Sequence, residues 1–188
     1  MEPHDGVAAY QGDYDQSRNL RYARKPDPVP RQDVRQVWFA GAHADIGGGY
    51  PESESALSKY PLDWMINEAK NAGLHINTAI RNQLVLGQER KGSHNKYVAP
   101  SATGPIHNSM TAGWEVLEWL PKSVKWRERP DRPSFLGCYL PRSEARLIPE
   151  GARLHYSVIA RRDADRTYSP PNLPQKVEVE SYPDAPPP

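Results

Sequence analysis

Residues Val37–Tyr50 read VWFAGAHADIGGGY, an apolar run followed by one histidine, one aspartate and three consecutive glycines. β-Branched and aromatic residues bounded by glycine predict a short buried strand. His43 is then expected just beyond the carboxyl end of this strand, where open α/β sheets hold their sites. Gly47, Gly48 and Gly49 allow the chain to turn sharply, or allow another group to approach the backbone closely. The local prediction is a strand, a histidine-bearing loop and a helix.

The composition excludes several classes of protein. The 188 residues suffice for one domain, and 24 basic against 23 acidic side chains give a net charge of +1, which argues against nucleic acid as a partner. Cys138 is the only cysteine in the sequence, so an internal disulfide and a thiolate metal cluster are excluded. The sequence has no leader with a basic start and no apolar run of about 20 residues. We therefore expect no Sec signal, no membrane anchor and a chain that is cytoplasmic when made.

Three zones differ in composition. Residues 1–33 are polar, with spaced prolines that predict an irregular N-terminal segment. Residues 34–168 hold nearly all of the periodic apolar segments, and residues 169–188 have the composition of a proline-rich tail. The 20 prolines of the chain are about twice the average share. This composition indicates one core with loops and tails in excess, or a part of a larger core.

Apolar residues at helical spacing mark the central zone. The spacing predicts a helix between Ser58 and Gly73 and a shorter one over residues 78–86. An amphipathic segment is expected over residues 114–120. Over residues 148–161, two apolar side chains four residues apart follow an early proline, which favours a fourth helix.

Five blocks of sequence, in order over residues 34–174, resemble the C-terminal half of an uncharacterised α/β-hydrolase domain family. They are WFAGAHADIGGGYPE, LDWMINEAKNAGL, IHNSM before GWEVLEWLPK, IPEGARLHYSVIARR and YSPPNLP. That family includes the Tle-one class of type VI secretion phospholipase effectors. The resemblance implies an α/β fold made of the C-terminal portion of an α/β-hydrolase sheet with flanking helices, incomplete as a domain. It also implies a Ser-Asp-His hydrolase acting on lipid esters, exported by type VI secretion and without a cofactor.

The same resemblance implies a role for each residue of the histidine block. His43 takes the part of the triad histidine, the general base that accepts the serine proton and returns it to the leaving group. Asp45 is assigned to organise the loop, because the acid of the family lies upstream of this block; its alternative role is that of the triad acid. Gly47, Gly48 and Gly49 are structural turn residues in either case.

The chain also departs from the family. No Gly-x-Ser-x-Gly elbow occurs in the sequence, and the 33 residues before the first predicted strand are too few for the nucleophile-bearing half of a sheet. We therefore expect the downstream part of a hydrolase, inactive alone because the serine elbow and the triad acid are missing. Its expected partners are an upstream nucleophile-bearing segment or chain and, by resemblance, a lipid substrate. An uncovered half-sheet also predicts self-association.

Two other interpretations remain open from the sequence. His43 and Asp45 could bind one metal ion with His107 or His155 as a third ligand, but two ligands without a visible third are a weak signal, and we expect no metal site. Alternatively, the chain is a non-catalytic interaction module left from a decayed hydrolase. His107, in a predicted loop, and His155, on a predicted helix, are interpreted as packed or solvent-bound histidines.

Overall fold

The computed structural model describes residues 34–110, 112–126, 133–142, 145–182 and 186. The chain divides into two compact units, Met1–Gln36 and Val37–Pro188. Of the first unit, residues 34–36 alone are among the described residues, and they form no helix or strand. The fold presented below is therefore that of the second unit.

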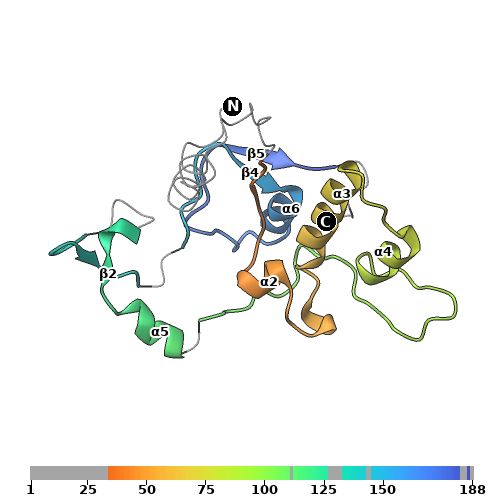
Figure 1. Ribbon diagram of the computed structural model, residues 1–188, viewed down its shortest axis with the longest axis horizontal. Helices are drawn as coiled ribbons and strands as arrows, with labels where there is room; N and C mark the ends of the chain where they lie inside the picture. The colour runs from red at the N-terminus through yellow and green to blue at the C-terminus, as the bar shows by residue number, and fades with distance from the viewer. Residues whose placement is uncertain (1–33, 111, 127–132, 143–144, 183–185, 187–188) are drawn as a thin grey trace, which may run out of the picture. The chain divides into compact units, whose positions relative to one another are not determined.

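A three-stranded parallel sheet lies in the second unit (Figure 1). In sheet order its strands are β1 (Val37–Trp38), β4 (Ala152–His155) and β5 (Val177–Glu180). The register pairs Trp38 with Leu154, and Leu154 with Val179. Two neighbouring parallel strands need a crossover connection, and α6 (Tyr156–Ala164) lies in the connection between β4 and β5. Helices combined with a small parallel sheet are the mixture expected of the α/β class.

Apolar side chains pack the sheet against α6. Ala40, Leu154 and Val158 form a buried cluster. Partly buried apolar residues cover this cluster, namely Trp38, Ile159, Tyr168, Leu173 and Val177. Because Leu154 lies on the central strand and Val158 on the helix that follows it, the core forms where β4 leads into α6.

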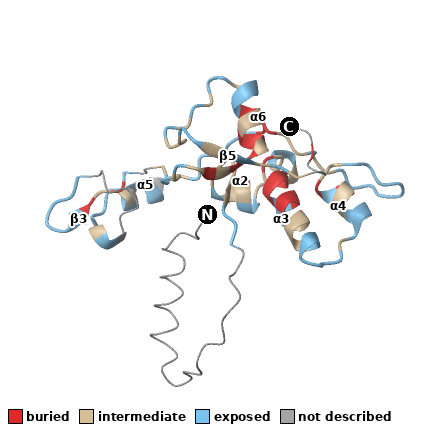
Figure 2. Ribbon diagram, turned by 90° about the horizontal axis from the view of Figure 1, so that it is seen from above, coloured by how far each residue is buried: buried red, intermediate tan, exposed pale blue. Residues whose placement is uncertain are grey.

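Two of the predicted helices are confirmed. α3 spans Lys59–Asn71, and Gly73, just beyond it, has a φ of +96°, the left-handed conformation that commonly ends helices. α4 spans Thr78–Leu84, and the Asn77 side chain caps it by accepting a hydrogen bond of 3.1 Å from the Ile80 amide. Figure 2 shows buried residues along α3 and α6.

A buried carboxylate connects α3, α4 and the C-terminal segment. Asp63 on α3 is 0% exposed. The Arg81 guanidinium of α4 donates to both carboxylate oxygens, at 2.7 Å from Nε and 2.9 Å from a terminal nitrogen. The Tyr182 hydroxyl donates to Asp63 Oδ2 at 2.8 Å. A buried charge is stable only with such partners, so these contacts fix where the three segments meet.

The remaining elements are short. α5 (Ala112–Glu118) and a 3-10 helix, η2 (Val124–Trp126), flank β2 (Lys122–Ser123), and β2 pairs antiparallel with β3 (Cys138–Tyr139). The amphipathic segment predicted over residues 114–120 thus coincides largely with α5. Large apolar side chains here are at least 45% exposed, namely Trp114, Val116, Leu117, Trp119 and Leu120. This region therefore presents an apolar surface, whereas an amphipathic helix of a closed core buries its apolar face.

The helix predicted over residues 148–161 is wrong in its first half. Residues Ala152–His155 form strand β4, and helix α6 begins only at Tyr156. β4 is the central strand of the sheet, so its backbone hydrogen bonds are satisfied from both sides. Leu154, 1% exposed, is buried as a strand residue, and pairing with two neighbouring strands overrides the helical spacing of Leu154 and Val158.

The proline-rich composition of residues 169–188 conceals an ordered part of the fold. Val177–Glu180 form β5, which pairs in parallel with β4 over Ala152–His155. The segment reads VEVE, the two-residue alternation of a strand, between proline-rich flanks. Beyond β5, Tyr182 reaches Asp63, and the Tyr156 hydroxyl donates to the Pro186 carbonyl. These residues therefore contribute to the packing of the unit.

Replacing Tyr182 with phenylalanine should lower the free energy of unfolding by about 1 to 3 kcal/mol, because the change removes a hydrogen bond to a buried charge. Chemical denaturation monitored by tryptophan fluorescence measures this loss. Tyr97→Phe is the matched control, since among the described residues the Tyr97 hydroxyl makes no hydrogen bond. Equal stability of Tyr182→Phe and the unmodified chain would contradict the contact.

Candidate functional site

The site begins with a buried aspartate on a short helix that follows β1. α2 spans His43–Gly47, and Asp45 is its third residue. Asp45 is 3% exposed. Its Oδ2 accepts hydrogen bonds from two backbone amides, that of Ala42 at 2.8 Å and that of His107 at 3.1 Å. An aspartate in the first turn stabilises the free amides of a helix N-terminus, so Asp45 caps its own helix while it binds a second segment.

That second segment supplies an imidazole. His107 lies in the loop between α4 and α5, and its Nδ1 is 2.6 Å from Asp45 Oδ1. The ring of Tyr50 stacks on the His107 ring, with 3.7 Å between centroids and 24° between planes. Asp45 thus contacts both the backbone and the ring of His107, and Tyr50 covers one face of that ring. These contacts hold the imidazole in one orientation.

A second carboxylate reaches the opposite nitrogen of the same ring. Glu54, the last residue of the 3-10 helix η1 (Glu52–Glu54), has its Oε2 at 3.1 Å from His107 Nε2. The hydrogen bond that the ring donates to Asp45, more than the one it donates to Glu54, raises the pKa of His107 above the ordinary value of 6.5. The site is therefore an imidazole between two carboxylates.

The backbone before α2 requires a glycine at Gly41. Its φ is +128°, and a Cβ built there would lie 2.5 Å from the Cβ of Asp45. Both facts exclude a side chain, so Gly41 permits the close approach that Asp45 needs. Among the predicted turn glycines, Gly48 and Gly49 have φ of +80° and +135°, whereas Gly47 is the last residue of helix α2 and does not have a positive φ.

The loop that carries His107 is anchored on α6. The Arg161 guanidinium donates to the carbonyl oxygens of Ala102 at 2.8 Å and Gly104 at 2.7 Å. Arg161 is 9% exposed, so these hydrogen bonds to a buried cation are well shielded from water. After His107, the Asn108 side chain accepts a hydrogen bond of 2.9 Å from the Met110 amide, a local turn. Arg161 thus fixes the chain before His107, and the Asn108 turn orders the chain directly after it.

The structure separates His43 from this pair. His43 is the first residue of α2 and is exposed. Within the described part of the chain, its side chain makes no hydrogen bond or ion pair. Asp45, two residues further along the same helix, instead contacts His107. The carboxylate and imidazole that meet are thus Asp45 and His107, although the sequence pointed to His43.

His155 lies elsewhere, in an aromatic cluster. It ends β4, is 0% exposed and stacks on Phe39 with 4.6 Å between ring centroids. Its Nδ1 is 2.8 Å from Ser157 Oγ, and burial lowers its pKa to about 4. His155 is thus a neutral packed histidine, as expected, but it ends a strand, which differs from the predicted helix position. The described residues contain no group of three or more His, Cys, Asp or Glu side chains arranged to hold a metal ion.

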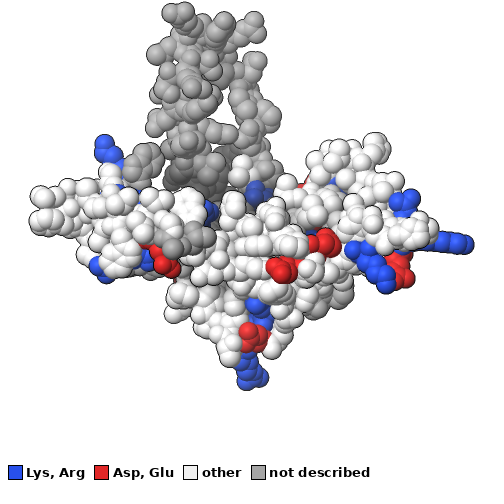
Figure 3. Space-filling view, turned by 90° about the horizontal axis from the view of Figure 1, so that it is seen from below, with Lys and Arg blue, Asp and Glu red and all other residues white. Residues whose placement is uncertain are grey.

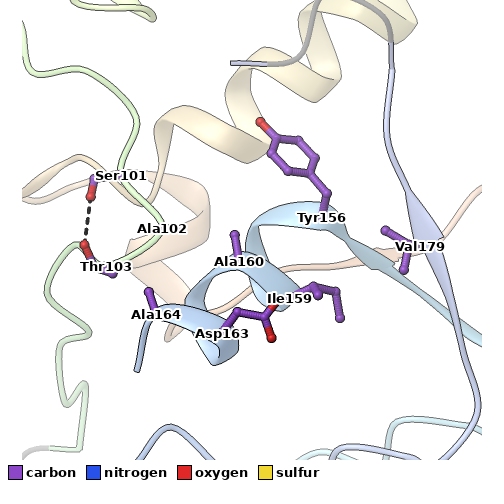
Figure 4. A pocket seen from close by; sticks show the side chains of 9 residues that line it. All are labelled: Ser101, Ala102, Thr103, Tyr156, Ile159, Ala160, Asp163, Ala164 and Val179. Atoms are coloured by element: carbon purple, nitrogen blue, oxygen red, sulfur yellow. Dashed lines mark hydrogen bonds between the residues drawn. The ribbon is translucent and has the colours of Figure 1, made fainter. Parts of the chain in front are cut away.

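A pocket of about 580 Å³ lies beside α6 (Figure 4). Its lining is mostly apolar and comprises Ser101, Ala102, Thr103, Tyr156, Ile159, Ala160, Asp163, Ala164 and Val179. Thr103 is four residues before His107, so the extended chain limits their separation to about 14 Å. The pocket is therefore close in the chain to the Asp45–His107 pair.

A buried carboxylate that accepts from Nδ1 of an imidazole is the arrangement of the acid and base in hydrolase triads. The carboxylate fixes the tautomer and leaves Nε2 to accept a proton. No serine, threonine or cysteine side chain among the described residues hydrogen-bonds to His107. The geometry thus provides an acid–base pair without a nucleophile beside it.

One family model matches the first part of the chain. Residues 9–68 match the family model of the type VI secretion Tle1-like phospholipase effector catalytic domain. This Tle1-like match includes His43, Asp45 and Glu54 and ends before His107. It begins at residue 9, upstream of the resemblance noted from residue 34, within the segment predicted to be irregular.

A curated relative is much longer than this chain. Uncharacterized protein YEL023C of Saccharomyces cerevisiae is 25% identical over an alignment 208 positions long, which covers 77% of this chain and 30% of that protein. No solved structure matches the chain. In the described part of the chain, no helix has the length and apolar character needed to cross a membrane.

The sequence holds one local signal for His107. The block IHNSM, residues 106–110, places a histidine before an asparagine and a serine, residues that favour tight turns. It lay within the family resemblance, but His107 was interpreted as a packed or solvent-bound histidine. Asp45 and His107 are far apart in the sequence, and no local pattern indicates that they meet.

Replacing Asp45 with asparagine should lower the pKa of His107 toward the ordinary value of 6.5, because a neutral amide no longer favours the imidazolium. A raised histidine pKa gives stability that is complete below about pH 6.5 and is lost as the pH rises through the raised pKa. This pH-dependent contribution to the free energy of unfolding should be smaller in Asp45→Asn. NMR titration of the imidazole and denaturation at several pH values measure the two effects.

Asp163→Asn is the control for this change, since Asp163 is an exposed carboxylate on α6. His107→Gln assigns the imidazole signal among the 6 histidines. The control should leave the pKa of His107 unchanged. An unchanged His107 pKa in Asp45→Asn as well would show that the carboxylate and the ring do not meet in solution.

Proposed function

We propose that this chain contributes the acid–base part of a lipase-like serine-hydrolase site, with His107 as general base and Asp45 as the acid that orients it. One observation carries the proposal: the contact of 2.6 Å between the buried Asp45 Oδ1 and His107 Nδ1. The Tle1-like match of residues 9–68 supports a phospholipase-effector-like catalytic domain at a coarse level.

The chemistry follows from the two nitrogens of the ring. Asp45 accepts a hydrogen bond from Nδ1–H, so the Nε2 lone pair of a neutral His107 takes the proton of a serine hydroxyl as the hydroxyl oxygen attacks an ester carbonyl. The ester C–O bond then breaks, and Nε2–H returns the proton to the departing alkoxide. Water repeats the cycle on the acyl-enzyme and regenerates the serine. The negative Asp45 stabilises the imidazolium that exists between these proton transfers.

This assignment changes the roles expected from the sequence. His43 was expected to be the base, but it is exposed and has no carboxylate partner among the described residues. His107 is held by Asp45 and Tyr50 and is 21% exposed at its side chain, so it is both oriented and accessible. Asp45 accordingly takes the role of acid, the alternative weighed from the sequence.

The serine comes from outside the described residues in this proposal. The 188 residues contain no Gly-x-Ser-x-Gly elbow, so we propose an upstream segment or a second chain as its source. The described sheet is then the C-terminal portion of an α/β-hydrolase sheet. The chain spans 30% of the length of the curated relative it matches, which is consistent with a chain that corresponds to part of a longer protein.

A lipid ester is the proposed substrate class, and type VI secretion is the proposed route of export. Both rest on the Tle1-like family match. The apolar pocket beside α6 supports the substrate class, because a volume of about 580 Å³ lies in the usual range of ligand sites. Five of its nine lining residues are aliphatic, which suits an acyl chain.

Association with itself or with the missing segment is also proposed. The exposed apolar side chains on and around α5 form a surface that monomeric proteins seldom leave uncovered. On the face that Figure 3 presents, acidic and basic side chains are scattered among uncharged residues. Such a surface favours association through apolar contacts rather than through a strong field of one sign.

The test supplies the missing nucleophile. The purified chain alone should show no labelling by a fluorophosphonate probe above background. Joined to an upstream segment of a Tle1-like effector that carries the serine elbow, in cis or in trans, it should hydrolyse phospholipid esters. In that active form, His107→Ala should reduce kcat by roughly 10³-fold or more, and Asp45→Asn by a similar order.

His43→Ala is the matched control, because His43 lies on the same short helix as Asp45 but is exposed. It should retain most of the activity. Loss of activity in His43→Ala with retention of activity in His107→Ala would show that His43, and not His107, is the general base. Labelling of a serine in the chain alone would show that the nucleophile lies within these 188 residues.

A further inference from the structure

Glu54 contacts Nε2 of His107, the nitrogen that accepts the serine proton in the proposed reaction. Its Oε2 lies 3.1 Å from Nε2, while Asp45 Oδ1 lies 2.6 Å from Nδ1. Ionised carboxylates only accept hydrogen bonds, so both ring nitrogens must donate. The ring between them is then an imidazolium, and its Nε2 has no lone pair with which to accept a proton.

The two carboxylates differ in how firmly they are held. The Asp45 side chain is 1% exposed and accepts from two backbone amides as well as from the ring. The Glu54 side chain is 49% exposed, and His107 is its partner among the described residues. Exposed ion pairs contribute little stability because water screens them. Asp45 is therefore the fixed partner of His107, and Glu54 is the exchangeable one.

Glu52, on the same 3-10 helix as Glu54, is held by several contacts. Glu52 accepts from the Lys59 ammonium at 2.8 Å and from the Val98 amide at 2.9 Å. Lys59 is only 6% exposed and also donates to the Leu84 carbonyl at 2.8 Å. Glu52 thus anchors η1 to the body of the unit, and Glu54, at the end of the helix, can leave His107 without disturbing that anchor.

We propose that Glu54 is a displaceable latch on the base: its carboxylate holds His107 Nε2 in the resting chain and gives way when a nucleophile's hydroxyl reaches the same nitrogen. The latch regulates the site described above and so rests on the proposed function. When Glu54 leaves, the pKa of His107 falls, Nε2 releases its proton to water, and the serine hydroxyl donates to the lone pair set free. Glu54 and the serine cannot both occupy that nitrogen. The base is thereby kept unreactive until the site is complete.

The charged groups around the ring agree with this arrangement. Asp45 faces His107 from α2 and Glu54 faces it from η1, while the ring of Tyr50 covers one face. The cation nearest in the sequence to Glu54, Lys59, is directed to Glu52. Both carboxylates raise the pKa of His107, so removal of Glu54 alone should leave a partly raised pKa, set by Asp45.

The experiment measures the reactivity of Nε2 and needs no enzymatic activity. Diethyl pyrocarbonate acylates unprotonated imidazole nitrogen, and peptide mass spectrometry of the full chain gives the rate at each histidine. At about pH 6, Glu54→Gln and Glu54→Ala should each raise the rate at His107 by roughly three- to tenfold, because one pKa unit changes the neutral fraction about tenfold below the pKa. His43, exposed on the same surface helix as Asp45, is the internal reference and should not change.

Glu89→Gln, at a glutamate outside η1 whose side chain is 87% exposed, is the control and should leave the rate at His107 unchanged. Equal rates at His107 in the unmodified chain and both Glu54 variants would overturn the latch. A raised rate in a chain that stays inactive with an upstream serine segment would support the latch and count against the proposed function alone. In an active form, Glu54→Ala should move the acid limb of the pH profile to lower pH; an unmoved limb would also overturn the proposal.

Discussion

The buried carboxylate of Asp45 is the constraint on which the site depends. An ionised carboxylate that loses contact with water needs a hydrogen-bond donor for each oxygen. Asp45 obtains these donors from the Ala42 and His107 amides and from the His107 ring. Because two of the donors belong to a residue 62 positions away, satisfying the charge and assembling the acid–base pair are the same event.

A second buried carboxylate organises another part of the unit. Asp63 binds Arg81 and Tyr182 and so joins α3, α4 and the C-terminal segment. The strands of the sheet are only 2 to 4 residues long, and the buried apolar cluster around β4 and α6 is small. Polar contacts with well-defined geometry therefore determine much of the arrangement of helices, whereas larger domains rely more on apolar packing.

The position of the base between two carboxylates connects structure and function. Asp45, which is tightly held, contacts Nδ1, and Glu54, which is loosely held, contacts Nε2; the proposed roles of the two carboxylates follow from this difference. The family match reaches Asp45 and Glu54 but not His107. The role of His107 is consequently argued from geometry, and the hydrolase class is argued from the match, so the two arguments are independent.

The sequence by itself determined two of the helices and pointed to a chemical class. Capping residues and apolar spacing predicted α3 and α4, because helix ends and amphipathic faces depend on residues close together in the chain. The block around His43 indicated the phospholipase-effector family, and the absence of a serine elbow was also evident. Only the tertiary structure decided the acid–base pair, because it brought His107 to Asp45 and left His43 exposed. It also decided that residues 152–155 and 177–180 are strands. These outcomes depend on which distant segment meets a buried charge or an unpaired strand, and no local spacing contains that information.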